Sequence, residues 1–112
     1  MDDNYYYTTI SRDEAPQGAD FAVRLKYRDL EPYFMKGSIV YCSKTEPVRD
    51  GDVGIFLLDG KLVFRQYCED MRGTMYFFSV NRALKKLDTQ VSGGHVTCFG
   101  KVLGITVPLP SD

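Results

Sequence analysis

The sequence predicts a mainly β fold, a curled and partly barrel-like sheet of about seven short strands. Three observations support this prediction. Short runs of β-branched and aromatic residues alternate with turn signals along most of the chain. Eight Tyr and seven Phe, with no Trp, are side chains that pack well on a pleated surface. Almost no segment has the apolar spacing of a helix.

The strands are predicted from alternation and from apolar runs. The first run, YYYTTI, is aromatic and β-branched, and farther on Phe21, Val23 and Leu25 alternate with small or charged residues. The run VGIFLL at 53–58 is strongly apolar. The predicted strands cover residues 5–10, 21–26, 38–42, 53–58, 61–68, 75–80 and 96–107.

Turn residues separate these strands. Asp59-Gly60 is the strongest hairpin signal, because a type I′ turn requires positive φ at both central positions and Asp-Gly tolerates it. Arg72-Gly73 marks a second hairpin. Residues 81–90 are polar with scattered apolar positions, which predicts a short helical or irregular piece.

Length and charge limit the classes of function. A chain of 112 residues forms one domain, 1–112, with a core expected over 19–107. The net charge is −1, and Lys85-Lys86 is the longest run of cations. The chain therefore lacks the basic surface of a nucleic-acid-binding domain, and no segment is left over for a separate helix-turn-helix head.

Cysteine usage indicates the compartment. Cys42, Cys68 and Cys98 are an odd number in a chain with no signal peptide and no apolar stretch long enough to span a membrane. A reduced cytoplasmic location is therefore expected, with each thiol buried as a small apolar group. His95 and Cys98 offer two metal ligands where zinc requires four, so no metal and no cofactor is predicted.

One segment of fourteen residues connects the chain to a known family. ADFAVRLKYRDLEP, at 19–32, resembles a motif of LexA-like and phage-repressor-like self-cleaving peptidases that reads approximately A-D-F-A-V-R-V-K-G-D-S-M-E-P. Five later segments are similar to family motifs in the same order: KGSIV to D-G-D-I-V, PVRDGDV to P-x-x-G-D-I-V, GKLVFRQY to G-E-x-T-V-K-R-L, SVN to S-L-N-P, and FGKVLG to I-x-G-x-V-x-G. The resemblance covers most of the chain and implies the complex β fold of a LexA C-terminal domain, which is signal-peptidase-like.

The resemblance also implies a Ser–Lys dyad, in which the Lys takes the proton of the attacking Ser hydroxyl. The matching positions here hold Asp29 and Arg65. Arg stays protonated and cannot act as a general base, and a carboxylate is a weak acyl acceptor. Tyr27 and Arg28 stand where the family has Gly and Asp, so a large side chain would crowd an approaching substrate backbone. The sequence therefore predicts a degenerate peptidase that is not an enzyme.

The vacated cleft is expected to be lined by Tyr27, Arg28, Asp29 and Arg65. Because the family's dyad residues contact one another, we predict an ion pair between Asp29 and Arg65. The alternative is that both side chains point apart into solvent. A buried pair need not add net stability, but removing one partner leaves a costly uncompensated charge.

An unrecognised nucleophile is one alternative to a lost activity. Ser38, Ser43 and Ser79 lie on or beside predicted strands, and His95 is the single His, but no Gly-x-Ser-x-Gly motif supports a catalytic triad. Four other carboxylates are expected to serve as turn and cap residues rather than as an acid–base pair: Glu31, Asp50, Asp52 and Asp59.

The resemblance further implies a dimerisation or regulatory domain of a transcription regulator, acting as a homodimer that pairs two DNA-binding heads. Apolar side chains on both faces of the last strand also favour a face covered by another subunit. DNA would be contacted only through a domain outside this chain. A regulator that cannot cleave itself needs a small-molecule or protein effector. A free-standing β module that binds a peptide or protein is a further alternative.

Overall fold

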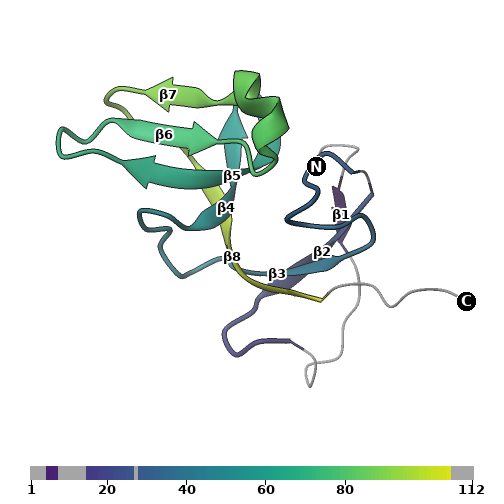
Figure 1. Cartoon of the computed structure of the whole chain (residues 1–112). Helices are drawn as coiled ribbons and strands as arrows, with labels where there is room; N and C mark the ends of the chain where they lie inside the picture. Colours follow the sequence, from purple (N-terminus) through teal and green to yellow (C-terminus); the bar gives the residue numbers. More distant parts are fainter. Residues whose placement is uncertain (1–4, 8–14, 27, 107–112) are drawn as a thin grey trace, which may run out of the picture.

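The computed structural model describes residues 5–7, 15–26 and 28–106, which form eight strands and one short 3-10 helix (Figure 1). Every pairing is antiparallel, and one sheet has the order β1-β2-β3-β8-β4-β5-β6-β7. The predicted mainly β class is confirmed. Because β1 and β7 stand at opposite ends of this order, the sheet is curled and open rather than closed into a barrel.

The elements follow the predicted order. The strands are β1 (Tyr5–Tyr7), β2 (Phe21–Leu25), β3 (Ile39–Ser43), β4 (Val53–Leu58), β5 (Lys61–Glu69), β6 (Met75–Phe78), β7 (Thr89–Val91) and β8 (Cys98–Thr106), and the 3-10 helix is η1 (Arg82–Leu87). Most predicted boundaries are correct to within two residues. Residues 8–10 and 107, which were predicted as strand, lie outside the described residues.

The segment at 81–90 is more ordered than the sequence predicted. Asn81 caps η1 by accepting a hydrogen bond from the backbone N–H of Ala83, at 3.0 Å. The helix is followed at once by β7, which pairs with β6 and is the one strand that the sequence did not predict. Three residues are too short to show an alternating pattern, so only the pairing with β6 defines this strand.

The last strand joins two parts of the sheet. β8 pairs with β3 through residues 101–106 and with β4 through residues 98–101. Figure 1 shows β8 passing from the group β4 to β7 into the group β1 to β3. The sheet therefore bends where β8 changes partner, and Gly100 lies at that point.

Local turn chemistry agrees with the sequence prediction. Asp59 and Gly60 have φ values of 49° and 77°, the positive values that a type I′ hairpin requires. The β4–β5 register then runs without a shift from Leu58–Lys61 to Val53–Gln66. This register places Arg65 directly opposite Gly54.

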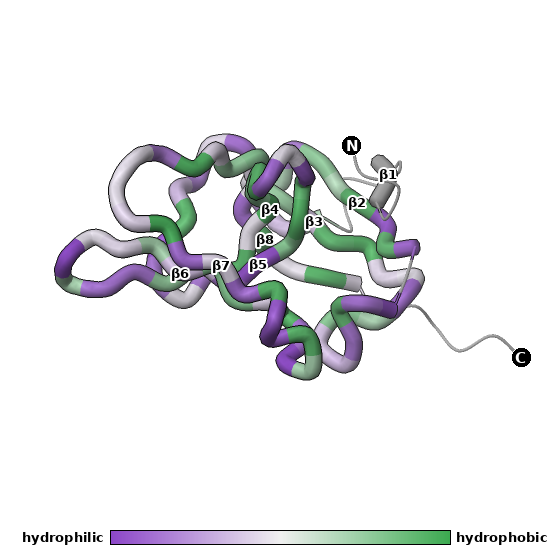
Figure 2. The backbone as a smooth tube through the Cα atoms, turned by 90° about the horizontal axis from the view of Figure 1, so that it is seen from above, coloured by the Kyte–Doolittle hydropathy of each residue, from purple (hydrophilic) through white to green (hydrophobic). Residues whose placement is uncertain are grey.

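The main core lies between the curled halves of the sheet. Val23, Val40 and Phe64 are fully buried there, and Leu30 reaches them from the β2–β3 turn. On the other face of β4 and β5, the rings of Phe56, Tyr67 and Phe77 form an aromatic cluster with centroids 4.9–6.1 Å apart. Figure 2 shows apolar stretches along β2 and β3 and hydrophilic residues at the hairpin tips. None of the described helices is long and apolar enough to cross a membrane.

Candidate functional site

The β2–β3 turn carries Asp29, one of the two residues predicted to replace the family's dyad. Leu30 is 4% exposed and packs into the core, which fixes the turn beside the half-buried Asp29. The backbone N–H of Glu31 donates to the carbonyl oxygen of Arg28, and that of Phe34 donates to Leu30, each at 3.0 Å. Arg28 is exposed, and Tyr27 lies outside the described residues. Asp29 therefore occupies a constrained turn and not an open loop.

Arg65, the other residue predicted to replace the dyad, lies in the middle of β5. Its side chain is half-buried, and its Nη1 donates to the carbonyl oxygen of Phe64 at 2.7 Å. Its positive charge also acts on Asp88, which follows η1. The described contacts of Arg65 thus extend toward η1, and the pairing of Arg65 with Asp29 stays a prediction.

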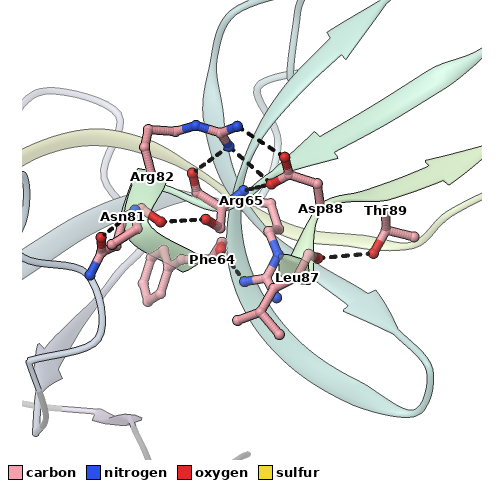
Figure 3. Close-up of polar contacts among 9 residues, drawn as sticks. Phe64, Arg65, Asn81, Arg82, Leu87, Asp88 and Thr89 are labelled. Carbon is pink, nitrogen blue, oxygen red and sulfur yellow. Dashed lines mark hydrogen bonds and ion pairs between the residues drawn. The ribbon is translucent and has the colours of Figure 1, made fainter. Parts of the chain in front are cut away.

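A polar network lies beside Arg65 at the ends of η1 (Figure 3). Arg82 donates two hydrogen bonds to Asp88, from Nη1 at 2.9 Å and from Nη2 at 3.0 Å. Asp88 Oδ1 also accepts the backbone N–H of Ser79 at 2.8 Å, and Arg82 Nη1 donates to the carbonyl oxygen of Ser79 at 3.2 Å. The network ties both ends of η1 to the end of β6.

The charge of Asp88 is stabilised by this network. Partial burial of the carboxylate works to raise its pKa, but the hydrogen bonds from Arg82 and the Ser79 backbone, and the charges of Arg82 and Arg65, outweigh burial. The pKa of Asp88 is therefore lower than usual. Arg65 supports this network, because its permanent positive charge favours the ionised form of Asp88.

A pocket of about 260 Å³ is lined by residues of the β2–β3 turn, which carries Asp29, and of β5, which carries Arg65, together with β4 and the segment leading into η1. The β2–β3 turn provides Tyr33 and Phe34, β4 and β5 provide Val53 and Gln66, and the segment leading into η1 provides Ser79, Val80 and Arg82. Apolar side chains form most of its walls. The sequence prediction missed Arg82 and Asp88 as site residues, although the similarity of SVN to a family motif had marked the preceding segment.

The other candidate nucleophiles are buried. Ser38, Ser43 and Ser79 are exposed by 0%, 1% and 4%. Ser43 Oγ accepts backbone N–H groups of Thr45 and Glu46, and Ser79 Oγ donates to the carbonyl oxygen of Asn81. A substrate carbonyl would have to enter the packed interior to reach Ser38 or Ser43. Ser79 lines the pocket of about 260 Å³, but its hydroxyl is donated to the carbonyl oxygen of Asn81.

All four turn carboxylates act as turn or cap residues, as predicted. Glu31 accepts the backbone N–H of Lys36, Asp50 accepts that of Glu69, and Asp52 accepts that of Arg49, at 3.1, 3.0 and 2.8 Å. Asp59 occupies the β4–β5 turn at positive φ. Hydrogen bonds and turn geometry therefore give each of these four carboxylates a structural role.

The cysteines differ in exposure. Cys42 is buried as predicted and Cys68 is half-buried, but Cys98 is exposed, so the prediction of a buried thiol is wrong there. β3 pairs with β8 only from Lys101 onward, which leaves Cys98 with an open flank. A second pocket of about 190 Å³ is lined by Cys98 and the exposed His95, above the aromatic cluster. In the described part of the chain no three His, Cys, Asp or Glu side chains are grouped to hold a metal ion.

Comparison with known proteins agrees with this geometry. The family model described as Peptidase S24-like matches residues 2–103, nearly the whole chain. No curated protein matches the sequence significantly. The matched region includes the β2–β3 turn, β5 and the segment around η1, so it contains Asp29, Arg65 and the residues that line the pocket of about 260 Å³. The chain therefore belongs to the Peptidase S24-like family.

Proposed function

We propose that this domain is a non-catalytic dimerisation and regulatory module of a LexA-like or phage-repressor-like transcription regulator. The proposal rests on Asp29 and Arg65, the residues at the positions that the sequence resemblance matches to the family's Ser and Lys. Replacement of the Ser alone would leave a general base in place, and replacement of the Lys alone would leave a nucleophile. Here both roles are lost, because Arg holds its proton at physiological pH and a carboxylate does not form a stable acyl intermediate.

The surroundings of the two positions support this proposal. Asp29 follows exposed Arg28 in a turn anchored by Leu30, and Arg65 contributes its charge to a network that ends on Asp88. Of the serines that could replace the lost nucleophile, Ser38 and Ser43 are buried in the interior. Ser79 lines the pocket, but it is 4% exposed and donates its hydroxyl to the carbonyl oxygen of Asn81. A domain that keeps the family fold but lacks the residues for peptidase activity is suited to a role in assembly. DNA would then be contacted through a domain outside this chain.

Self-cleavage is the direct test of lost activity. The chain is incubated at pH 7 and at pH 10, where an S24-type Lys would be deprotonated, and its mass is followed by mass spectrometry. We expect a single intact mass under both conditions. A fragment that appears faster at alkaline pH would contradict the proposal and favour a hydrolase with another nucleophile.

Oligomeric state tests the assembly role independently. Size-exclusion chromatography with light scattering is expected to give a dimer whose fraction rises with concentration. A strict monomer at the highest soluble concentration would contradict dimerisation and favour a free-standing binding module.

A further inference from the structure

The pocket between Tyr33 and Arg82 is bordered by two chain segments that are rich in cations. Residues 26–38 and 79–88 together carry six basic side chains and three carboxylates. The basic residues are Lys26, Arg28, Lys36, Arg82, Lys85 and Lys86, and the acidic residues are Asp29, Glu31 and Asp88. These two segments therefore have an excess of three positive charges, although the net charge of the whole chain is −1. The rest of the chain is correspondingly acidic.

Two of the three carboxylates are already engaged. Asp88 forms the paired hydrogen bonds with Arg82, and Glu31 accepts the backbone N–H of Lys36. Lys36, Lys85 and Lys86 are exposed, and they belong to the two segments whose other residues line the pocket. With the Arg82–Asp88 pair set aside, five basic residues and two carboxylates remain on the two segments, so the excess of three positive charges persists.

The apolar part of the pocket is preformed. The ring of Phe34 packs edge-on against the buried Phe64, with centroids 6.3 Å apart. The guanidinium of Arg82 lies 5.4 Å from the ring centroid of Phe78 while it is held by Asp88. Hydrogen bonds to Asp88, and to a smaller extent the electrostatic effect of Tyr33 across the pocket, raise the pKa of Arg82. Rigid walls of this kind reduce the entropic cost of binding.

The size of the pocket distinguishes between classes of ligand. Its volume of about 260 Å³ lies below the range of roughly 300–1,000 Å³ that is typical of small-molecule sites. It accommodates one apolar side chain. Tyr33, 59% exposed at its rim, extends the contact surface beyond the cavity. An extended peptide can place one apolar side chain in the pocket and its neighbouring carboxylates over the basic segments that border it.

We propose that this face binds an acidic peptide segment of a partner protein. An aromatic or aliphatic side chain of the peptide enters the pocket, and flanking carboxylates pair with Lys36, Lys85 and Lys86. The inference rests on the proposed function, because it names the effector that a regulator without self-cleavage requires. A second copy of this chain is disfavoured as the occupant, since a two-fold contact through this face would bring like charges together.

The probe is the terminally blocked, fluorescein-labelled pentapeptide Glu-Asp-Phe-Asp-Glu, followed by fluorescence anisotropy. We expect saturable binding to the full chain, weakened at least about tenfold when Ala replaces the central Phe. The variants Tyr33→Ala and Lys85→Glu/Lys86→Glu each weaken binding by at least about fivefold, and the effect of the charge reversal decreases at high salt. Lys61→Glu/Arg72→Glu, at the tips of two hairpins, is the matched charge-reversal control and leaves binding unchanged.

Amide chemical shifts locate the peptide on the protein. Perturbations confined to residues 28–38, 53, 66 and 79–88 support the proposal. Shifts centred on His95 and the aromatic cluster contradict it, as does the absence of saturable binding up to about 1 mM. Equal affinities of the protein for the Phe and Ala peptides also overturn the proposal. So do equal peptide affinities of Lys85→Glu/Lys86→Glu and its control, Lys61→Glu/Arg72→Glu.

Failure of this inference is distinguishable from failure of the proposed function. All substituted residues are exposed, and thermal unfolding of each variant verifies that it folds. A dimer with an intact mass that does not bind the peptide contradicts the peptide site alone. A self-cleaving or strictly monomeric chain that binds the peptide at this face contradicts the proposed function alone.

Discussion

Arg82 and Asp88 form a bidentate ion pair that spans the 3-10 helix η1. Its two hydrogen bonds are 2.9 and 3.0 Å long. The same carboxylate accepts the backbone N–H of the buried Ser79. The Asp88 side chain thus connects the end of β6, the helix η1 and the start of β7. Because Arg82 and Ser79 also line the pocket, the pair helps to fix the shape of the candidate site.

Removing the Asp88 side chain is expected to destabilise the domain. Asp88→Ala leaves the buried Ser79 N–H without its acceptor, which costs about 1–2 kcal/mol. Asp88→Asn keeps an acceptor oxygen and is expected to cost less. Urea denaturation measures both variants. Asp59→Asn is the control, because Asn tolerates the positive φ of that turn and should be nearly neutral.

The Asp88 network also predicts a pH dependence. The pKa of Asp88 is lower in the folded state than in the unfolded chain, where a carboxyl titrates near about 3.9. Its contribution to stability is therefore complete above that value and is lost as the pH falls through the folded pKa. The stability difference between the native chain and Asp88→Asn should decrease below about pH 4. A difference that stays constant down to pH 2 would show that the network does not stabilise the ionised carboxylate.

The predicted Asp29–Arg65 pair is tested by a double-mutant cycle. If the pair forms, Asp29→Ala destabilises the chain by more than Asp29→Ala/Arg65→Met, because the double variant leaves no uncompensated charge. A coupling energy of at least about 0.5 kcal/mol is expected from chemical denaturation. Equal stabilities of the single and double variants would show that the pair is absent.

Gly100, where β8 changes partner, is expected to reject a side chain. An added Cβ would lie 2.6 Å from the ring of Phe21 and 3.2 Å from Cβ of Cys42. Gly100→Ala should therefore cost about 1–3 kcal/mol, measured by thermal unfolding. Gly104→Ala on the same strand is the control, since its Cβ would meet Pro16 at an ordinary 3.5 Å. Equal melting temperatures for the two variants would contradict close packing at Gly100.

Thiol reactivity should follow burial. Desolvation, and to a smaller extent the neighbouring Cys98, raise the pKa of Cys42 to about 12. Because the thiolate is the reactive form, Cys42 should not react with a thiol reagent at pH 8 in the folded chain. We expect at most two thiols to react under native conditions and all three in guanidinium. Prompt reaction of all three in the native state would show that Cys42 is accessible.

The sequence alone determined the class of the fold, most strand positions and the β4–β5 hairpin. These features depend on local physics: alternation along a pleated strand, and the positive φ that Asp59 and Gly60 adopt. The ordered motifs also indicated the family before any geometry was known. The prediction that Asp29 and Arg65 replace the dyad also came from the chain alone, because matching motifs along a sequence requires no fold.

Only the tertiary structure decided which segments meet. β7 has three residues and no detectable period, so it exists through its pairing with β6. The transfer of β8 from β4 to β3 depends on register between strands distant in sequence. The Arg82–Asp88 pair and the pocket depend on how η1 returns toward the β2–β3 turn. Local sequence patterns specify which face of an element is apolar, but the direction of a side chain toward a distant partner is set by packing of the whole sheet.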